Sequence, residues 1–286
     1  MVLRERLMLI KFWGVHGSLP RPGPTTLKYG GNTACVEVRC GNTLIIFDAG
    51  TGIRELGEDI VRRHKVSDLN DKVFGHIFFS HLHWDHVQGF PFFAPAFMNG
   101  AEFHLYGGSD LNSTIYRLMR EQMDYPNFPV RLDELSAKLK FHDLDAGEKL
   151  SIDGVLVRTE RLNHPGGSFG YRLEAGRKIV VYASDTEHEP EVYPKMLKLA
   201  DKADILIYDS MFTPEQYLGT GDEICRQSWG HSTWEAAVQL AAEAGIGRLI
   251  LFHHGNCDDV VAEIERKAKE KFPRTIAAYE GLEIEL

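Results

Sequence analysis

Several apolar segments of this chain end at a histidine or an aspartate, and this pattern constrains the fold more than any other feature. The strand-like runs at 76–80, 155–163, 178–184 and 248–254 all end in such a residue or are followed directly by one. Packed strands bring their ends into one place although these lie far apart in the chain. A single histidine after a strand is usually a satisfied polar residue, but four such endings together indicate a composite metal centre.

Short apolar runs separated by glycine, asparagine and aspartate turns predict a chain with many strands. Helical periodicity alternates with strands mainly toward the end of the chain. The expected strands cover residues 7–14, 34–40, 43–50, 76–80, 102–107, 139–144, 155–163, 168–176, 178–184, 205–210, 248–254 and 275–286. The expected helices cover residues 53–64, 113–123, 191–203, 233–245 and 258–272. Together these patterns predict an α/β chain with more than one sheet.

The composition predicts one soluble globular domain over residues 1–286, because 43% of the chain is hydrophobic and no repeat or long linker divides it. The apolar runs are far shorter than the roughly 18 residues that a membrane span needs. Lys11 interrupts the N-terminal apolar segment too early for a secretory signal, so we expect a cytoplasmic protein. The net charge of -9 argues against a broad nucleic-acid-binding surface.

The cysteines are expected to be reduced thiols. None of Cys35, Cys40, Cys225 and Cys257 forms a C-x-x-C pair. The first two fall on opposite faces of one predicted strand, so they cannot face each other.

The densest group of metal-binding side chains is the segment 81–86, HLHWDH, directly after the run at 76–80. In a turn that leaves a strand, its first two histidines can converge on one cation, and its aspartate and last histidine can face a second. A ligand set of imidazole and carboxylate without thiolate favours zinc and also tolerates manganese or iron. The other strand ends add the candidates His164, Asp185, His253 and His254.

With this motif the chain resembles the metallo-β-lactamase superfamily, whose H-x-H-x-D-H signature stands at residues 81–86. The resemblance covers nearly the whole chain, through "FDAGTG", "NHPGGSFGYRL", "VYASDTEH" and "LILFHHG". It implies a four-layer αβ/βα sandwich with two mixed sheets and a binuclear metal centre at one edge of them. It assigns His81, His83 and His164 to one metal ion, Asp85, His86 and His253 to the other, and Asp185 to a bridge between the two.

Two further positions depend on the resemblance. His253 is preferred to the adjacent His254 as the ligand, because its spacing from "RLIL" matches the ribonuclease Z-like branch. Asp48 in "FDAGTG" is expected to hydrogen-bond a ligand histidine, as carboxylates around metal sites do. The alternative for Asp48 is that it only caps the turn after its strand.

The segments "ADILIYDSMF" and "WGHSTWEAAVQLA" resemble the ribonuclease Z and phosphodiesterase branch, in which an acidic residue orients a histidine toward the phosphate. The corresponding residues are Asp209 and His231. His231 could then protonate the leaving alkoxide, close to a helix N-terminus that favours anions. The alternative is that His231 only precedes a helix whose N-cap is Ser232 or Thr233.

We therefore expect a metal-dependent hydrolase with Asp85, His231 and Asp209 as catalytic residues. Two metal ions with a bridging hydroxide can activate water toward a phosphoryl group or an acyl carbon. Acyl hydrolysis does not require the Asp209–His231 pair, so a phosphodiesterase is favoured over a lactone or thioester hydrolase. A non-hydrolytic oxidoreductase or binding protein is the least favoured reading, because His83 stands where flavodiiron-type relatives carry glutamate.

The expected substrate is a small phosphodiester or a cyclic nucleotide. Ribonuclease Z enzymes that process tRNA grip it with a protruding glycine- and proline-rich arm, and the chain between Asp185 and Asp209 offers only a short helix. An RNA-processing nuclease is thus the alternative, and a homodimer is left open. The segment 110–135 could form a lid over the site. Its aromatic residues Tyr116, Tyr125 and Phe128 are expected to pack within the protein, and the alternative is that they stack on a base of the substrate.

Overall fold

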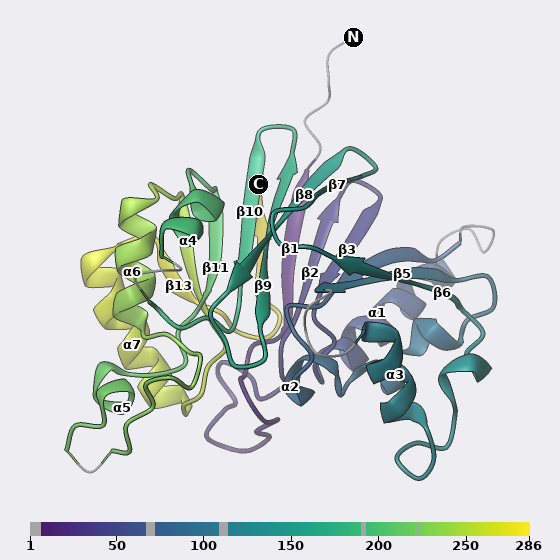
Figure 1. The fold of residues 1–286 in the computed structure, drawn as a ribbon, viewed down its shortest axis with the longest axis horizontal. Helices are drawn as coiled ribbons and strands as arrows, with labels where there is room; N and C mark the ends of the chain where they lie inside the picture. The colour runs from purple at the N-terminus through teal and green to yellow at the C-terminus, as the bar shows by residue number, and fades with distance from the viewer. Residues whose placement is uncertain (1–6, 67–71, 109–113, 190–192, 222) are drawn as a thin grey trace.

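The computed structural model describes residues 7–66, 72–108, 114–189, 193–221 and 223–286, which form two mixed seven-stranded sheets (Figure 1). In spatial order the first sheet contains β14 (Glu283–Glu285), β1 (Met8–Gly14), β2 (Cys35–Cys40), β3 (Thr43–Phe47), β4 (Phe74–Phe78), β5 (Glu102–Gly108) and β6 (Lys138–Leu144). The second contains β13 (Thr275–Ala277), β12 (Arg248–Phe252), β11 (Ile205–Asp209), β10 (Lys178–Ala183), β9 (Ser168–Ala175), β8 (Val155–Leu162) and β7 (Lys149–Ile152).

Each sheet contains a parallel half. Strands β3 to β6 run parallel in the first sheet, and β10 to β13 run parallel in the second. Within each half, the carboxyl ends of the strands therefore lie at one edge of the sheet, where ligand sites of α/β proteins commonly form. The remaining pairs, among them β1 with β2 and β8 with β9, are antiparallel.

The inner faces of the two sheets meet in an aromatic core. The ring of Phe47 stacks on that of Tyr182 with 4.7 Å between their centroids, and Phe78 meets Tyr171 edge-on at 5.2 Å. All four side chains are fully buried. Because hydrophobic burial contributes about 25 cal/mol per Å² of apolar surface, these large rings fix the two sheets face to face.

Helices cover the outer faces of both sheets. The helices α1 (Ile53–Val66) and α3 (Ile115–Met123) pack on the first sheet, and α4 (Tyr193–Ala200), α6 (Trp234–Glu243) and α7 (Asp258–Lys271) pack on the second (Figure 1). The connecting segments contain the short helices α2 (Trp84–Val87) and α5 (Pro214–Leu218) and the 3₁₀ turns η1 (Phe90–Phe92), η2 (Ala94–Phe97) and η3 (Leu132–Glu134). The predicted four-layer αβ/βα sandwich is confirmed.

The C-terminal segment differs from its prediction. Residues 275–286 were expected to form one strand, but they form β13 in the second sheet and β14 in the first. The change of sheet occurs around Gly281, whose backbone is left-handed (φ +88°). Strand β7 was missed because its four residues, KLSI, carry too little apolar pattern. The predicted helix at 191–203 begins in a part of the chain outside the described residues, and α4 ends earlier, at Ala200.

The four cysteines, all among the described residues, form no disulfide. Cys35 packs in the core beneath α1, and Cys40 packs in the core between the sheets. They therefore lie on opposite faces of β2. No helix among the described residues is long and apolar enough to cross a membrane.

Candidate metal centre

The predicted ligands meet at the edge of the sandwich where β4, β8, β10 and β12 end. The segment 81–86 follows β4 and includes the first three residues of α2, which lies at the lower centre of Figure 1. His164 follows β8, Asp185 follows β10 and His253 follows β12. Seven side chains that are up to 172 residues apart in the chain (His81 to His253) therefore form two adjoining groups that could hold metal ions.

One group consists of four buried side chains, Asp85, His86, Asp185 and His253. The Nε2 atom of His86 lies 3.2 Å from a carboxylate oxygen of Asp85, from one of Asp185 and from Nε2 of His253. The Nε2 atom of His253 lies 3.1 Å and 3.3 Å from the same two oxygens. Four donors placed about 2.0–2.1 Å from a tetrahedral zinc ion stand about 3.3 Å from one another. The group thus has the spacing of a tetrahedral ligand set.

The other group consists of His81, His83 and His164. Nε2 of His164 lies 3.0 Å from Nδ1 of His83, and the second oxygen of Asp185 lies 3.7 Å from His81 Nε2 and 3.9 Å from His164 Nε2. His81 Nε2 is buried and has no hydrogen-bond partner among the described residues, which is costly for a polar atom unless a cation is bound. Asp185 directs one oxygen to each group, as expected of a bridge. His83 is exposed, so the centre opens to solvent on its side.

Hydrogen bonds outside these groups orient the imidazoles. Nδ1 of His86 lies 2.8 Å from a carboxylate oxygen of Asp48, and Nδ1 of His164 lies 2.8 Å from the carbonyl oxygen of Gly230. An N–H donated at Nδ1 leaves the lone pair of Nε2 facing the centre. Asp48 is fully buried and also accepts the hydroxyl of Tyr182 at 2.6 Å. The hydrogen bond expected from Asp48 to a ligand histidine is therefore present.

Three residues of the site have left-handed backbone conformations at the ends of their strands: Asp48 (φ 60°), Asp185 (φ 54°) and His253 (φ 60°). Residues other than glycine seldom adopt this conformation, and residues held in it tend to cluster at functional sites. The chain also passes close to the His253 ring, since a Cβ atom at Gly17 would lie 2.5 Å from it. The backbone conformations at these strand ends therefore direct the side chains of Asp48, Asp185 and His253 toward the candidate metal centre.

The adjacent histidines point to different places. His253 contributes Nε2 to the buried group, whereas Nε2 of His254 lies 2.9 Å from the carbonyl oxygen of Ala278. Burial lowers the pKa of His254 to about 4, so this side chain is neutral at physiological pH. The structure therefore places His253, and not His254, among the candidate ligands.

Asp209 and His231 form a hydrogen-bonded pair beside the centre. The distance between Asp209 Oδ2 and His231 Nδ1 is 2.7 Å, and the His231 ring stacks on that of His253 with 5.1 Å between centroids. Burial lowers the pKa of His231, but the carboxylate of Asp209 outweighs this effect and raises the pKa to about 9. The hydroxyl of Thr233, not that of Ser232, caps helix α6. His231 thus has a position that capping does not explain.

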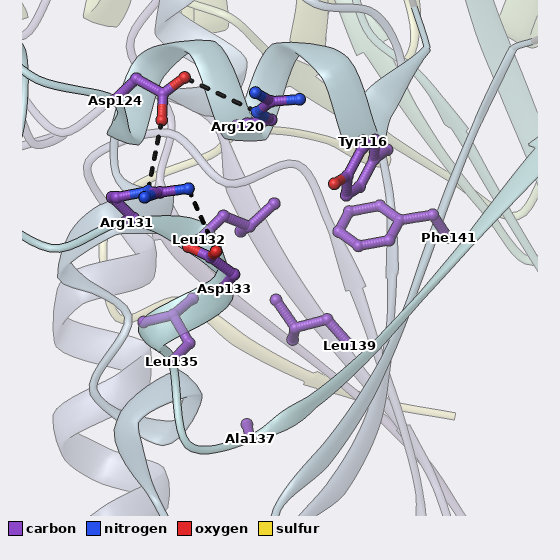
Figure 2. Close-up of a pocket in the computed structure, with 10 residues that line it drawn as sticks. All are labelled: Tyr116, Arg120, Asp124, Arg131, Leu132, Asp133, Leu135, Ala137, Leu139 and Phe141. Atoms are coloured by element: carbon purple, nitrogen blue, oxygen red, sulfur yellow. Dashed lines mark hydrogen bonds and ion pairs between the residues drawn. The ribbon is translucent and has the colours of Figure 1, made fainter.

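The described part of segment 110–135, which begins at residue 114, lies over a cavity separate from the metal centre. This cavity of about 480 Å³ has none of the seven candidate ligands in its wall. Figure 2 shows Arg120 and Arg131 on either side of Asp124 at its rim, with apolar side chains beneath them. These charged groups are largely exposed, so their ion pairs contribute little stability.

The three aromatic residues of this segment have different environments. Phe128 packs edge-on against Phe92 at 5.4 Å, as expected, whereas Tyr116 meets Phe141 edge-on at 5.2 Å but remains 49% exposed. The expectation that Tyr125 packs within the protein is wrong, because its side chain is 90% exposed.

Two contacts of the candidate ligands were not predicted. The backbone N–H of Ser18 donates to Asp85 at 2.7 Å, and the carbonyl of Gly230 accepts from His164. Both partners are backbone groups, so their residue types carry no signal of the role. The only sequence hint is the glycine at position 230, where a Cβ atom would lie 2.3 Å from His164 Nδ1.

The fold and the site define a hydrolase of the metallo-β-lactamase type. The profile of the beta-lactamase superfamily domain matches residues 43–254, so the chain belongs to this superfamily and the resemblance seen in its motif is confirmed.

The individual relatives described below are distant, but each covers nearly the whole chain. Ribonuclease Z of Staphylococcus carnosus (strain TM300) is 24% identical across 96% of this chain and 100% of its own. Among solved structures, the metallo-beta-lactamase fold protein YhfI from Bacillus subtilis is 20% identical, with a TM-score of 0.73 over 98% of this chain and 100% of that one. A diphosphatase from the PhnP family is 16% identical, with a TM-score of 0.64 over 98% and 97% of the two chains. At these identities the structural likeness shows the fold alone.

Proposed function

We propose that this protein is a binuclear metal-dependent phosphodiesterase that acts on small phosphodiesters, including cyclic nucleotides. The observation that carries the proposal is the 2.7 Å hydrogen bond between Asp209 and His231, directly beside the candidate metal centre. A carboxylate that holds a histidine in one tautomer is the arrangement needed for general acid catalysis.

The residues present fit two divalent ions. The ligands of one would be His81, His83 and His164, those of the other Asp85, His86 and His253, and Asp185 would bridge them. Zinc is favoured by the nitrogen and oxygen donors and by the tetrahedral spacing of the buried group, and manganese or iron is the alternative. When bound, the metal ions would polarise the phosphoryl oxygen and lower the pKa of a water molecule.

The residues around the ions have distinct tasks in this proposal. Asp85 is held by the Ser18 N–H at 2.7 Å, which keeps its carboxylate directed into the centre. His231 carries the proton that the leaving alkoxide accepts from Nε2, while Asp209 holds Nδ1 and stabilises the charged ring. Helix α6 begins three residues later, and its N-terminus favours the negative charge of the phosphate.

An RNA-processing nuclease is the second candidate, because curated relatives such as the Staphylococcus carnosus protein are named ribonuclease Z. Two observations favour a small substrate. The described residues between Asp185 and Asp209 contain helix α4, packed on the second sheet, and most of strand β11, and they include no protruding arm. The net charge of -9 also opposes binding to a large polyanion.

The proposal is tested by a substrate screen of the metal-loaded protein. The panel is bis(p-nitrophenyl) phosphate, cyclic nucleotides, a lactone, a thioester and a tRNA precursor. We expect turnover of the first two classes. Cleavage of the tRNA precursor alone would establish the nuclease instead, and turnover of only the lactone or the thioester would contradict both phosphate-directed functions.

His231→Ala is expected to lower kcat for a cyclic nucleotide about 10²- to 10⁴-fold, the usual contribution of a general acid. Metal content should stay near that of the wild type. Asp209→Asn should give a smaller loss, and the double variant should lose less than the product of the two, because the residues act as a unit.

The leaving group supplies the control for this prediction. p-Nitrophenolate needs little protonation, so His231→Ala should impair bis(p-nitrophenyl) phosphate hydrolysis less than hydrolysis of a nucleoside diester. Equal losses on both substrates would mean that His231 binds the phosphate without donating a proton.

A further inference from the structure

Glu187, two residues beyond Asp185, has a buried carboxylate that accepts three hydrogen bonds. Its side chain is only 4% exposed. Oε1 accepts the hydroxyl of Tyr217 and the backbone N–H of Ser228, both at 2.7 Å, and Oε2 accepts the backbone N–H of Gly230 at 2.9 Å. Burying a carboxylate is costly, and hydrogen bonds to an ionised acceptor offset that cost more strongly than neutral ones. Glu187 is therefore tied mainly to the turn at residues 228–230.

The same turn holds a candidate ligand. The backbone N–H of Glu187 donates to the carbonyl of Asn163 at 2.7 Å, and Nδ1 of the next residue, His164, lies 2.8 Å from the carbonyl of Gly230. Gly230 in turn donates its N–H to the carboxylate of Glu187. These three hydrogen bonds therefore connect Glu187, the segment Asn163–His164 and Gly230 in a closed ring. The side chain of Glu187 is thus connected to the imidazole of His164 through Gly230.

The backbone conformation of the turn at residues 228–230 is not one that its own sequence favours. Ser228 (φ 67°) and Gly230 (φ 83°) both have left-handed backbones, which is unfavourable for serine. Gly230 lies so close to His164 that an added Cβ atom would stand 2.3 Å from Nδ1. The backbone of the turn therefore has little room to adopt another conformation. The two N–H groups that Glu187 accepts belong to these two residues, so its carboxylate stabilises this conformation.

We propose that Glu187 is a positioning residue for the metal centre. It fixes the carbonyl of Gly230, which keeps the proton of His164 on Nδ1 and directs the Nε2 lone pair at the metal. His231 follows Gly230 directly and is placed by the same turn. The inference rests on the proposed role of His164 as a metal ligand, and it does not depend on which substrate is cleaved.

Glu187→Gln tests this role with little change in shape. An amide nitrogen cannot accept a hydrogen bond, so at least one of the three donors loses its acceptor and faces another N–H. Glu189→Gln is the matched control, because it removes the same charge from an exposed position two residues away. The readout is zinc affinity, measured by competition with a chromophoric chelator on the full chain.

We expect Glu187→Gln to weaken one of two zinc equivalents about 10- to 100-fold, the usual effect of losing a residue that orients a ligand. The other equivalent and the Glu189→Gln variant should stay within about threefold of wild type, a margin below the effect of an orienting residue. In the zinc-loaded protein, the His164 Nδ1–H proton should also exchange faster with solvent in nuclear magnetic resonance spectra.

Wild-type affinity for both equivalents in folded Glu187→Gln would overturn the inference. The inference would also be overturned if Glu187→Gln lost affinity equally for both zinc equivalents and the metal-free variant melted at a lower temperature. The role of Glu187 would then be structural only. If Glu187→Gln does not fold, Glu187→Asp replaces it, since it keeps the charge but withdraws the carboxylate by one methylene. Absence of phosphodiesterase activity in the wild type would contradict the proposed function, and the zinc affinities would still decide this inference.

Discussion

Two adjacent histidines have different surroundings because of the backbone between them. The left-handed backbone of His253 turns its imidazole into the buried group, and His254 then points toward Ala278. We predict that His253→Ala empties or strongly weakens one metal site, whereas His254→Ala leaves both sites filled. Metal analysis after dialysis against a limited zinc concentration measures the difference. Loss of metal from His254→Ala alone would reverse the assignment.

Single residues also show what could be predicted from the sequence and what could not. The motif at 81–86 and the polar strand ends predicted that these side chains meet, because their chemistry is carried by residue type. The choice of His253 over His254 depended on the family resemblance. The roles of Ser18 and Gly230 could not be predicted in this way, since each acts through a backbone group. Glu187 was missed because nothing local distinguishes a glutamate that accepts backbone N–H groups from a solvated one.

The neighbouring strands β4, β5 and β6 carry a second set of histidines, away from the metal centre. His104 Nδ1 lies 3.1 Å from His142 Nε2, and His76 Nδ1 lies 3.1 Å from the hydroxyl of Tyr106. Burial and the neighbouring His104 lower the pKa of His76 to about 4, and the charge of Asp153 only partly opposes this. His76 is therefore neutral in the folded protein down to acidic pH.

The low pKa of His76 predicts that the folded protein loses stability in acid. In the unfolded chain His76 takes up a proton near pH 6.5, but in the folded chain it does so only near pH 4. Between these values the unfolded state binds more protons, so stability falls as the pH falls. Urea denaturation of the metal-free protein at pH 7 and pH 5 measures this loss, which should be smaller in His76→Gln. An equal loss in the variant would exclude His76 as the cause.

The elements themselves were predictable where local pattern decides them. Helices α1, α6 and α7 and most strands lie where periodicity indicated. The division of residues 275–286 between two sheets was not predictable, because strand pairing depends on partners far away in the chain. The pairing of β14 with β1 joins the last described strand to the first.

The candidate centre connects the two halves of the molecule. The segment 81–86 extends from the first sheet, whereas His164, Asp185 and His253 extend from the second. Metal ions bound to both sets would link the sheets at one edge of the sandwich. Because such ions bind the folded chain and not the unfolded one, their binding free energy adds to stability.

We predict about two equivalents of bound zinc and a higher melting temperature when they are present. Free zinc at 100 times the dissociation constant of a site should add about 2.7 kcal/mol per site to the free energy of unfolding. Calorimetry with zinc and with a chelator measures the effect, and Asp185→Asn, which changes the bridging carboxylate, should reduce it. An unchanged melting temperature after complete metal removal would contradict a link between the sheets.

At Asp48, Asp185 and His253 the chain keeps a strained, left-handed backbone and thereby keeps a side chain that the candidate site uses. Each such conformation costs about 1 kcal/mol or more for a residue other than glycine. Glycine at these positions would relax the chain but would remove a carboxylate or an imidazole from the centre. Backbone strain therefore favours glycine at these three positions, whereas the hydrogen bonds of Asp48 and the proposed zinc binding by Asp185 and His253 favour the present side chains. Because zinc binding also adds to stability, the zinc-loaded protein should lose both heat resistance and activity when Asp185 or His253 is replaced by glycine.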